Sequence, residues 1–258
     1  MSDCENIIEV TGLSKAYRRE KPPIYAVYHA SFTIRRGETL GLVGESGCGK
    51  STLGRLLLRL EKPTKGTIYF QNQDITDFSF GQMQKIRSSM QMIFQGSSNA
   101  FNPYYTVRQI IGEPLQNYHK VHGAEQERCI VSMLEHVGLD GSYLGRYSHE
   151  LSGGQRQRVG IAQALILEPE FVVCDEAVSS IDFALKKQIL KLLVDLKKKN
   201  GTTYLFISHD MAAVKAVCDR IMVMYLGNIL EILPSADAEA LHPYTQALMA
   251  ATLEPDPT

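Results

Sequence analysis

Residues Gly44–Ser51 combine glycines, a lysine and a serine at a spacing that suits phosphate chemistry. Their sequence, GESGCGKS, matches the pattern G-x-x-x-x-G-K-[ST], in which the backbone N–H groups of a glycine-rich loop surround a phosphate. Lys50 would place its charge between the β- and γ-phosphates of a nucleotide, and the Ser51 hydroxyl can bind Mg²⁺. The candidate ligands of this phosphate-binding loop are Gly44, Ser46, Gly47, Cys48, Gly49, Lys50, Ser51 and Thr52.

An acidic pair follows a second apolar segment. The run Phe171–Asp175, FVVCD, is apolar up to its last residue, and Glu176 comes next. Transfer of a phosphoryl group to water needs a carboxylate for the metal and a group that activates the water. Asp175 is the candidate metal ligand, and Glu176 is the candidate base. An acidic pair at a strand end can instead cap the next helix, but the phosphate loop favours the catalytic interpretation.

Two further polar residues come directly after apolar runs. His209 follows YLFIS, and Gln95 follows MQMIF. Because ligands gather at the carboxyl ends of strands in open α/β sheets, His209 is a candidate catalytic residue. The Gln95 carboxamide is a candidate ligand of Mg²⁺ or of water. For each residue a solvated or structural strand end is the alternative, and the residues alone do not separate the two.

The pentapeptide Leu151–Gln155, LSGGQ, has no obvious use in a folded core. Its two adjacent glycines free the backbone to bring N–H groups close to a ligand. The following run, RQRV, is typical of the first turn of a helix, whose N-terminus favours anions. The stretch therefore predicts a second anion-binding segment.

The elements that position these residues follow from alternating patterns. Short apolar runs at Thr39–Val43, Phe171–Asp175 and Thr203–Ser208 predict strands, and helical patterns lie between them. Apolar residues recur at helical spacing at Leu53, Leu56, Leu57 and Leu60, and again at Leu185, Ile189, Leu192, Leu193 and Leu196. We expect an α/β domain with a mostly parallel sheet, against which both stripes are buried, and a helix that ends at Gly201.

Two regions depart from this alternation. The opening third predicts an antiparallel, hairpin-rich β subdomain with turns at Gly37 and Gly66. The strand pattern disappears between Thr106 and Gly145, where residues such as Ile130 and Leu134 indicate a purely helical insert.

Composition limits the possible classes of function. The 27 Lys and Arg residues nearly balance the 28 Asp and Glu residues, so no global charge attracts nucleic acid or anionic lipid. The five cysteines are widely spaced, without a C-x-x-C pair or clustered histidines, which argues against a zinc site and a disulfide framework and favours a reducing cytosol. The acidic start MSDCENIIEV does not resemble a signal peptide, and no apolar run reaches about 18 residues, so we expect a soluble chain.

Taken in order along nearly the whole chain, these motifs resemble those of the ATP-binding subunits of ABC transporters. In the terms of that family, Tyr17 in LSKAY resembles the adenine-stacking aromatic residue, Gly44–Thr52 the P-loop and Gln95 the glutamine loop. Leu151–Gln155 resembles the signature and Phe171–Glu176 the Walker B strand. Ser180-Ile181-Asp182 resembles the D-loop, which adds Asp182 as a nucleotide ligand, and His209 the switch histidine.

The resemblance implies that ATP and Mg²⁺ bind between two subunits. Ser152, Gly153, Gly154 and Gln155 would contact the γ-phosphate held by the P-loop of a partner, in a head-to-tail dimer that closes on ATP and opens on hydrolysis. Glu176, His209 and Gln95 would be catalytic, and Ser51, Gln95 and Asp175 would hold the metal. The expected parts are a core with the antiparallel β subdomain over residues 1–95 and 160–235, a helical subdomain over 96–159 and a C-terminal extension over 236–258.

The branch of the family is indicated by longer stretches. GESGCGKSTLGRLLLRLEKPTKGTI, DEAVSSIDFALKKQIL and the tail HPYTQALMAA resemble the peptide and nickel uptake branch. Gly96-Ser97 after Gln95 and Ala177 after Glu176 depart from many peptide-type members, and the change after Gln95 puts the permease contact in doubt. The stretches Ala177–Ser179 and Ser98–Pro103 resemble nickel-type second ATPases more, which favours nickel or a metal chelate as the cargo. The implied partners are a second ATPase, paralogous or identical, two membrane permeases and an extracytoplasmic binding protein, with the chain on the cytoplasmic face of the membrane.

Three other interpretations remain. A soluble ABC-type ATPase of DNA repair or translation would carry coiled-coil arms or a second cassette, and this sequence has neither. Exporters often fuse membrane helices to the cassette. A degenerate cassette that binds ATP without turnover is opposed by the presence of Lys50, Glu176 and His209. We therefore expect an importer ATPase without a nucleic-acid partner.

Overall fold

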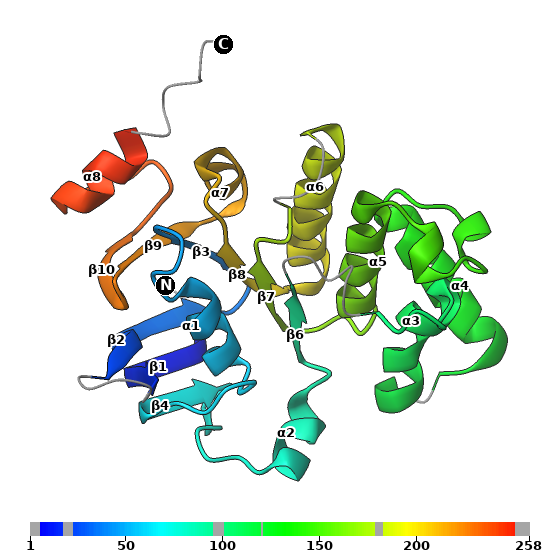
Figure 1. The fold of residues 1–258 in the computed structure, drawn as a ribbon, viewed down its shortest axis with the longest axis horizontal. Coiled ribbons are helices and arrows are strands. Elements are labelled where there is room, and N and C mark those ends of the chain that lie inside the picture. The colour runs from blue at the N-terminus through cyan, green and yellow to red at the C-terminus, as the bar shows by residue number, and fades with distance from the viewer. Residues whose placement is uncertain (1–5, 18–22, 95–100, 120, 179–182, 251–258) are drawn as a thin grey trace. The chain divides into compact units, whose positions relative to one another are not determined.

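The structure is a computed structural model that describes residues 6–17, 23–94, 101–119, 121–178 and 183–250. Figure 1 shows its elements in chain order. The chain divides into two compact units, residues 1–83 with 203–258 and residues 84–202. The predicted fold class, an α/β core with an antiparallel β subdomain and inserted helices, is confirmed in these elements.

The first unit contains an antiparallel sheet with strand order β2-β1-β4-β5. Its strands are β1 (Asn6–Tyr17), β2 (Ile24–Arg35), β4 (Lys65–Phe70) and β5 (Gln73–Asp74). Gly37 lies in the turn after β2, as predicted, but the turn expected at Gly66 is wrong. Gly66 lies inside β4 with φ +87°, and a side chain there would collide with the main chain of Gly12 on β1. The glycine permits close approach of two strands rather than a reversal of the chain.

The same unit contains four strands in the order β10-β9-β3-β8. They are β3 (Thr39–Val43), β8 (Thr203–Ile207), β9 (Arg220–Tyr225) and β10 (Asn228–Leu233). β3 pairs in parallel with β8 and β9, and every residue of β3 and β8 is buried, which explains why both read as unbroken apolar runs. The helices of this unit are α1 (Lys50–Leu57), α7 (Met211–Val217) and α8 (Pro243–Ala250).

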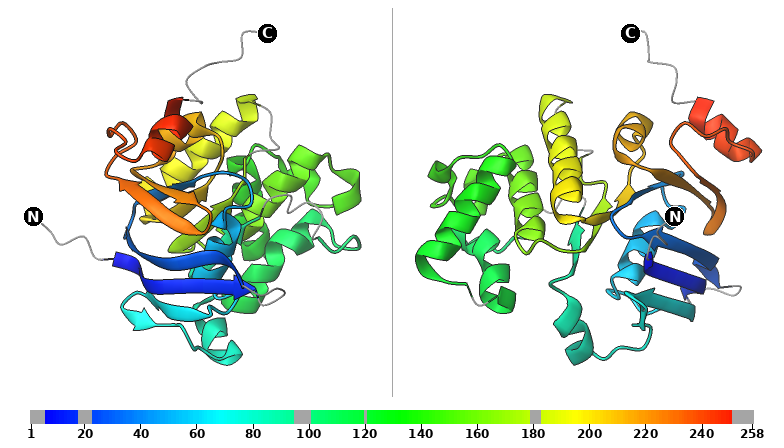
Figure 2. Two further views of the ribbon diagram at one scale, coloured as in Figure 1. Left: turned by 60° about the vertical axis from the view of Figure 1, so that its left-hand side comes forward. Right: turned by 180° about the vertical axis from the view of Figure 1, so that it is seen from behind.

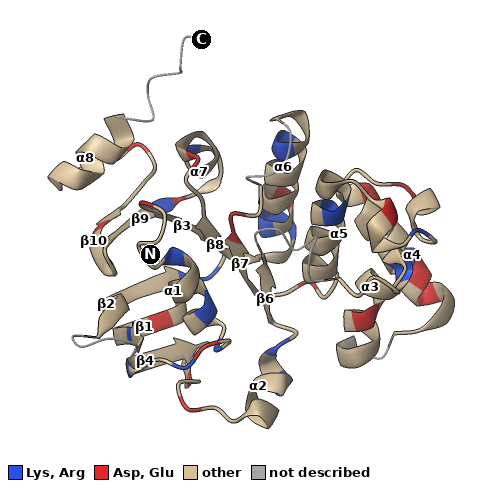
Figure 3. Cartoon of the chain, in the orientation of Figure 1, with Lys and Arg blue, Asp and Glu red and all other residues tan. Residues whose placement is uncertain are grey.

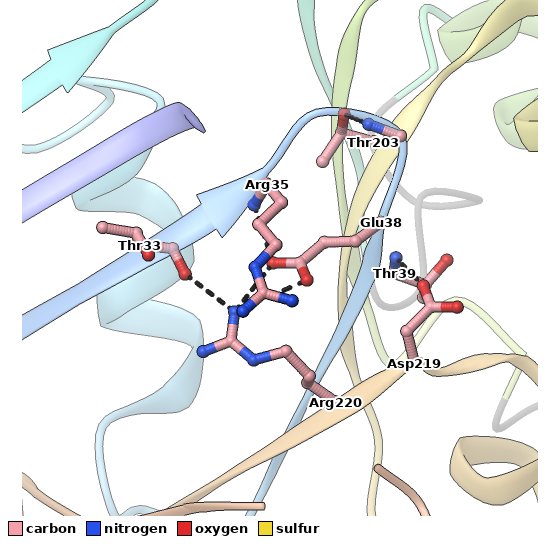
Figure 4. A network of polar contacts seen from close by, with 8 residues as sticks. Thr33, Arg35, Glu38, Thr39, Thr203, Asp219 and Arg220 are labelled. Atoms are coloured by element: carbon pink, nitrogen blue, oxygen red, sulfur yellow. Dashed lines mark hydrogen bonds and ion pairs between the residues drawn. The ribbon is translucent and has the colours of Figure 1, made fainter. Parts of the chain in front are cut away.

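A polar cluster holds the start of β3 (Figure 4). The carboxylate of Glu38, whose side chain is 7% exposed, accepts a hydrogen bond from the Arg35 N–H at 2.7 Å. The same carboxylate accepts from Nη1 of Arg220 at 3.1 Å, and Arg220 also donates to the Thr33 carbonyl at 3.3 Å. A partly buried ion pair, with the Arg220 side chain 14% exposed, therefore joins the end of β2 to the start of β9.

Two further bonds extend this cluster to the neighbouring strands. The Thr39 N–H donates to the carboxylate of Asp219 at 2.7 Å, and the Gly37 N–H donates to the hydroxyl of Thr203 at 2.8 Å (Figure 4). Because β3 leads directly into the loop that begins at Gly44, the cluster fixes the strand that carries that loop.

The second unit contains a parallel pair of strands and a group of helices. The strands are β6 (Met90–Ile93) and β7 (Phe171–Asp175), and α2 (Phe80–Ile86) precedes them along the chain. The helices are α3 (Val107–Pro114), α4 (Gly123–His136), α5 (Gly153–Leu165) and α6 (Phe183–Asn200). Figure 2 shows α3, α4 and α5 side by side in both views. A π-helical turn at Leu115–His119 follows α3, and 3₁₀ turns lie at Gly141–Tyr143 and Ser148–Glu150, so the predicted helical insert is confirmed.

The predicted stripe that begins at Leu53 is correct in its first three members. Leu53, Leu56 and Leu57 are completely buried, but Leu60 is 46% exposed and lies beyond the end of α1. The helix stops because Arg59 adopts a left-handed conformation with φ +51°. The second stripe lies on α6, where Ile189, Leu192 and Leu193 are buried, and that helix ends at Asn200 before Gly201, as predicted.

Charge is distributed over the helices in both signs. Figure 3 shows acidic and basic positions together on α4 and on α6, whereas β3 and β8 carry neither. This mixture agrees with the absence of a strong overall charge. Within the described ranges, no helix has the length and apolar character needed to cross a membrane.

Candidate nucleotide-binding site

The phosphate loop lies between β3 and α1, as its sequence predicts. Gly44 and Gly49 have φ values of +150° and +112°, which favour glycine. A Cβ atom at Gly44 would collide with the carbonyl oxygen of Met224, and one at Gly49 with that of Ala26. The main chain of the neighbouring strands β9 and β2 therefore packs directly against the loop and fixes its path. The same cradle leaves Glu45, Ser46 and Gly47 exposed at the rim.

Lys50, the first residue of α1, points back into this loop. Its side chain is buried, with the residue 6% exposed, and its ammonium group donates to the carbonyls of Gly44 at 2.8 Å and Glu45 at 2.7 Å. The Sγ atom of Cys48 lies 3.8 Å from the same nitrogen. A buried cation at a helix N-terminus, ringed by glycine-rich backbone, is an arrangement that fits a phosphate. Ser51 and Thr52 follow on the first turn of α1.

The hairpin that joins β9 and β10 supports the loop. The Gly227 N–H in this hairpin donates to the Cys48 carbonyl at 2.9 Å. Cys48 itself is only 4% exposed, although it lies in the middle of the loop. The cradle of the phosphate loop thus includes residues from the far end of the sequence.

Tyr17 lies beside the first turn of α1. Its ring is 41% exposed, its hydroxyl donates to the Glu61 carboxylate at 2.7 Å, and the ammonium group of Lys15 lies 5.3 Å from the ring centre. Burial, and after it the hydrogen bond to Glu61, raises the pKa of the Tyr17 phenol, and Thr52 is among its neighbours. A half-exposed aromatic face next to the phosphate loop is suited to stacking on a base.

His209 lies at the same edge of the sheet as the phosphate loop. β8 pairs in parallel with β3, with Ile207 opposite Leu42, so the residues after both strands share one edge. His209 is exposed, and the following Asp210 caps α7 by accepting from the Ala213 N–H at 3.1 Å. The cap fixes the turn in which the histidine lies.

The acidic pair lies at the corresponding edge of the second unit. Asp175, 4% exposed, ends β7, and burial raises the pKa of the neighbouring Cys174 thiol. Glu176 has φ +48°, a left-handed conformation that costs energy for a residue of this size. Such strain is common where a side chain must be aimed at a reaction centre. Gln95 and Asp182 lie outside the described residues.

A residue that the sequence analysis did not single out links the two strand ends of this unit. The amide of Gln157, on α5 and 3% exposed, donates to the carbonyl of Ala177 at 3.0 Å and to that of Phe94 at 3.3 Å. These carbonyls lie directly after β7 and β6. Gln157 stands in a polar run, RQR, and only the packing of α5 reveals its role.

The LSGGQ segment forms the start of α5 itself, one turn earlier than the RQRV run predicts. Ser152 is the N-cap: its hydroxyl accepts from the Gln155 N–H at 3.3 Å, and the Gln155 side chain accepts from the Ser152 N–H at 2.9 Å. Nothing lies within 4 Å of a Cβ atom built on Gly153 or Gly154. The chain's own fold therefore does not require glycine at either position, although glycine weakens a helix.

The residue types suit a magnesium nucleotide. The Ser51 hydroxyl and the Asp175 carboxylate are oxygen ligands of the kind that Mg²⁺ prefers, and Lys50 matches a phosphate. Ser51 belongs to the first unit and Asp175 to the second. Among the described residues, no cluster of three His, Cys, Asp or Glu side chains could hold a metal by itself.

Comparisons with known proteins agree with this site. The family model described as ABC transporter matches residues 27–179. The chain is 43% identical over 257 residues to the oligopeptide transport ATP-binding protein AppF of Bacillus subtilis, a match that covers 96% of this chain and 78% of that protein.

Two solved structures of ATP-binding cassettes and ABC transporter parts share this fold. The dimeric post-hydrolysis state of the ATP-binding cassette MJ0796, bound to ADP and phosphate, superposes with a TM-score of 0.83 at 27% identity over 88% of this chain and 98% of that one. The structure of cbiO1 from Clostridium perfringens, part of an ABC transporter complex, superposes with a TM-score of 0.77 at 30% identity over 89% of each chain. With its phosphate loop, its LSGGQ segment and these relatives, the chain belongs to the ABC transporter family, as one of its ATP-binding ATPase domains.

Proposed function

We propose that this ATPase is the motor subunit of an importer that takes up short peptides. The phosphate loop with its buried Lys50 supports nucleotide binding, and the printed name of the Bacillus subtilis relative supports a peptide cargo. The nickel cargo that Ala177–Ser179 and Ser98–Pro103 favoured receives no support from that relative and stays a prediction. In this proposal the chain works at the cytoplasmic face of the membrane, with two permeases and an extracytoplasmic binding protein.

Each residue of the site has a chemical task in the proposed reaction. Tyr17 stacks on the adenine, and Lys50 exchanges its two loop carbonyls for phosphate oxygens. The Glu176 carboxylate accepts a proton from water as the water oxygen bonds to the γ-phosphorus and the bond to ADP breaks. His209 and Gln95 orient the water and the γ-phosphate. Mg²⁺, held by Ser51, Asp175 and Gln95, would neutralise charge on the phosphate oxygens.

The proposed site is completed by a second ATPase subunit, paralogous or identical. The open space around Gly153 and Gly154 supports this step, because glycines that the chain's own fold does not require can serve the close approach of a ligand held by another molecule. In the head-to-tail dimer Ser152, Gly153, Gly154 and Gln155 contact the partner's γ-phosphate, and Asp182 lies at the same interface. ATP then joins the two subunits, and hydrolysis separates them.

The proposal is tested with the Glu176→Gln chain, which keeps the size of the side chain but cannot accept the proton. We expect hydrolysis to fall by about 10²–10⁴, while ATP is still bound and the dimer accumulates in sedimentation experiments. If the natural partner is a paralogue, the two chains are mixed. Turnover close to that of the wild type would remove Glu176 from the role of base.

A substitution in the signature separates sharing of the site from binding. Gly154→Asp, added to Glu176→Gln, should abolish the ATP-dependent dimer and leave the ATP affinity of the monomer nearly unchanged. Gly145→Asp is the matched control, since a side chain there also meets nothing within 4 Å, and it should leave the dimer intact. If Gly154→Asp destroys ATP binding in a monomeric sample, the signature acts on its own chain's nucleotide and the head-to-tail arrangement is wrong.

The cargo is tested on the assembled transporter. Membrane vesicles that contain the permeases and the binding protein should accumulate a radiolabelled short peptide when ATP is supplied on the cytoplasmic side. Accumulation of Ni²⁺ instead of peptide would favour the metal alternative, and the Glu176→Gln chain should abolish either activity.

A further inference from the structure

The last helix of the described chain, α8, lies beside the two strands that support the phosphate loop. Figure 2 shows it next to β9 and β10 in both views. Glu231 on β10 holds the segment that leads into it: its carboxylate accepts from the Leu241 N–H at 2.8 Å and from the His242 N–H at 3.2 Å. The segment is closed further by the Tyr244 N–H, which donates to Nδ1 of His242 at 3.1 Å. α8 is therefore anchored where it meets the sheet.

Tyr244, in the first turn of α8, extends this contact to the loop. Its ring packs on that of Tyr225, the last residue of β9, with ring centres 4.5 Å apart. Tyr225 is two residues before Gly227, whose N–H holds the Cys48 carbonyl of the phosphate loop. One route from α8 to the loop therefore runs through the hairpin between β9 and β10.

A second route is direct. The Tyr244 hydroxyl is buried and has no hydrogen-bond partner of good geometry within the described ranges. Burial raises the pKa of the Tyr244 phenol, and its polar neighbours are the main chain and carboxylate of Glu45 and the thiol of Cys48. Glu45 is also one of the two residues whose carbonyls bind Lys50. The hydroxyl end of the ring thus lies against the first half of the loop, at Glu45 and Cys48.

We propose that Tyr244 is a positioning residue for nucleotide binding: its ring, clamped between Tyr225 and Glu45, holds the first half of the phosphate loop in the shape that accepts phosphate. The inference rests on the proposed nucleotide site. The packing of the ring carries the effect, because the hydroxyl makes no good hydrogen bond that its removal would break. α8 acts as a brace that ties the C-terminal segment to the loop.

Three variants of the full-length chain test the proposal, with the dissociation constant of ATP measured by titration calorimetry. Tyr244→Ala removes the ring and should weaken ATP binding by about 2- to 10-fold, the range that the energy of an aromatic pair allows. Tyr244→Phe keeps the ring and should bind ATP within about twofold of the wild type, because a buried hydroxyl without a partner contributes nothing favourable. Leu241→Ala is the matched control, since this side chain in the same segment is 80% exposed, and it should change nothing.

Alkylation of cysteines by N-ethylmaleimide, mapped by mass spectrometry, separates a loosened loop from general unfolding. Cys48 should react faster in Tyr244→Ala than in the wild type, whereas Cys174 and Cys218, buried elsewhere, should stay protected. If Tyr244→Ala does not fold, Glu231→Gln provides the second variant. It weakens the anchor of α8 from a distance and should produce the same pattern to a smaller extent.

The outcomes decide between this inference and the proposed function. If the wild type binds ATP and Tyr244→Ala matches it in both affinity and Cys48 reactivity, the brace does not exist. A Tyr244→Phe chain as impaired as Tyr244→Ala would also overturn the proposal, because the hydroxyl would then carry the effect. If the wild type itself does not bind ATP, the nucleotide site fails instead.

Discussion

The ammonium group of Lys50 lies 2.7 Å from the carbonyl oxygen of Glu45, so the phosphate loop supplies the partners of its own lysine. The cation is thereby kept buried and aimed at the centre of the loop before any phosphate arrives. A phosphate needs only to replace two neutral carbonyls, and the side chain does not have to be ordered on binding.

Removal of this cation should weaken nucleotide binding. We expect Lys50→Ala to lower ATP affinity by about 10- to 100-fold, because a hydrogen bond to a charged group contributes about 1.5–3 kcal/mol. Titration calorimetry measures the effect, and Lys65→Ala, at an exposed lysine on β4, is the control. Unchanged affinity in Lys50→Ala would contradict the assignment of the phosphate loop.

Gln157 should couple the signature helix to catalysis. Gln157→Leu leaves the buried Ala177 carbonyl without this donor, and we expect it to lower the free energy of unfolding by about 1–3 kcal/mol. It should also reduce hydrolysis, because the segments after β6 and β7 lose their common tie.

Gln163→Leu is the matched control for that substitution. Gln163 lies on the same helix and donates to the Ile110 carbonyl at 3.0 Å, which belongs to α3 and not to a segment that follows β6 or β7. Chemical unfolding and ATP turnover are measured for both variants. Equal loss of turnover in the two would reduce Gln157 to a purely structural residue.

The cysteines should react in the order of their exposure. Cys129 is exposed on α4, whereas the Cys48 side chain is buried within the phosphate loop. Alkylation should therefore modify Cys129 well before Cys48. Modification of Cys48 should inactivate the enzyme, and Mg-ATP should slow it without protecting Cys129. Rapid labelling of Cys48 in the nucleotide-free chain would mean that the loop is more open than the structure describes.

The attachment of α8 should depend on pH through Glu231. Hydrogen bonding, first from the Leu241 N–H, lowers the pKa of this carboxyl, to which Thr245 and His242 also contribute. A group whose pKa is lowered by folding stabilises the fold above its unfolded pKa, near 4.3, and the stabilisation is lost as the pH falls through the folded value. Cys48 should therefore become more reactive once the pH falls below about 4.3, after correction for the pH dependence of a free thiol.

The matched variant is Glu231→Gln, which cannot titrate at this position. Its Cys48 reactivity, corrected in the same way, should not rise through Glu231 as the pH falls below about 4.3. A wild-type chain that shows the same flat profile would remove Glu231 from this role.

The phosphate loop and the strands and helix beside it were predictable from local pattern. The phosphate loop needs its glycines and lysine at fixed spacing, and β3 and β7 read as strands because burial on both faces makes them continuously apolar. The end of α1 could not be predicted, because Arg59 adopts the left-handed conformation that usually requires a glycine after a helix. The structure compensates for this with a hydrogen bond from Nε of Arg59 to the Ile75 carbonyl at 2.9 Å.

Contacts between distant parts of the sequence were not predictable for a different reason. Gln157 and Tyr244 stand in segments whose patterns indicate only helices, and nothing local distinguishes them from their neighbours. Their importance comes from what the fold brings against them, a pair of strand ends in one case and the phosphate loop in the other. Gly66 led to a wrong prediction of a turn, because a glycine is needed both in a turn and where a strand packs closely on its neighbour, here β1.

The ion pair between Glu38 and Arg220 gives β3 two ends of different character. The start of β3 is held by this ion pair, and its other end leads into the phosphate loop. A substitution at the start therefore need not alter the groups that bind the nucleotide. Loss of one partner of a fully buried pair costs about 3–5 kcal/mol, and a smaller loss at this partly buried pair is still a large fraction of the free energy of unfolding of an ordinary domain. Arg220→Met is therefore a rational route to a conditional allele, whose ATPase domain is active in the cold and inactive when warmed.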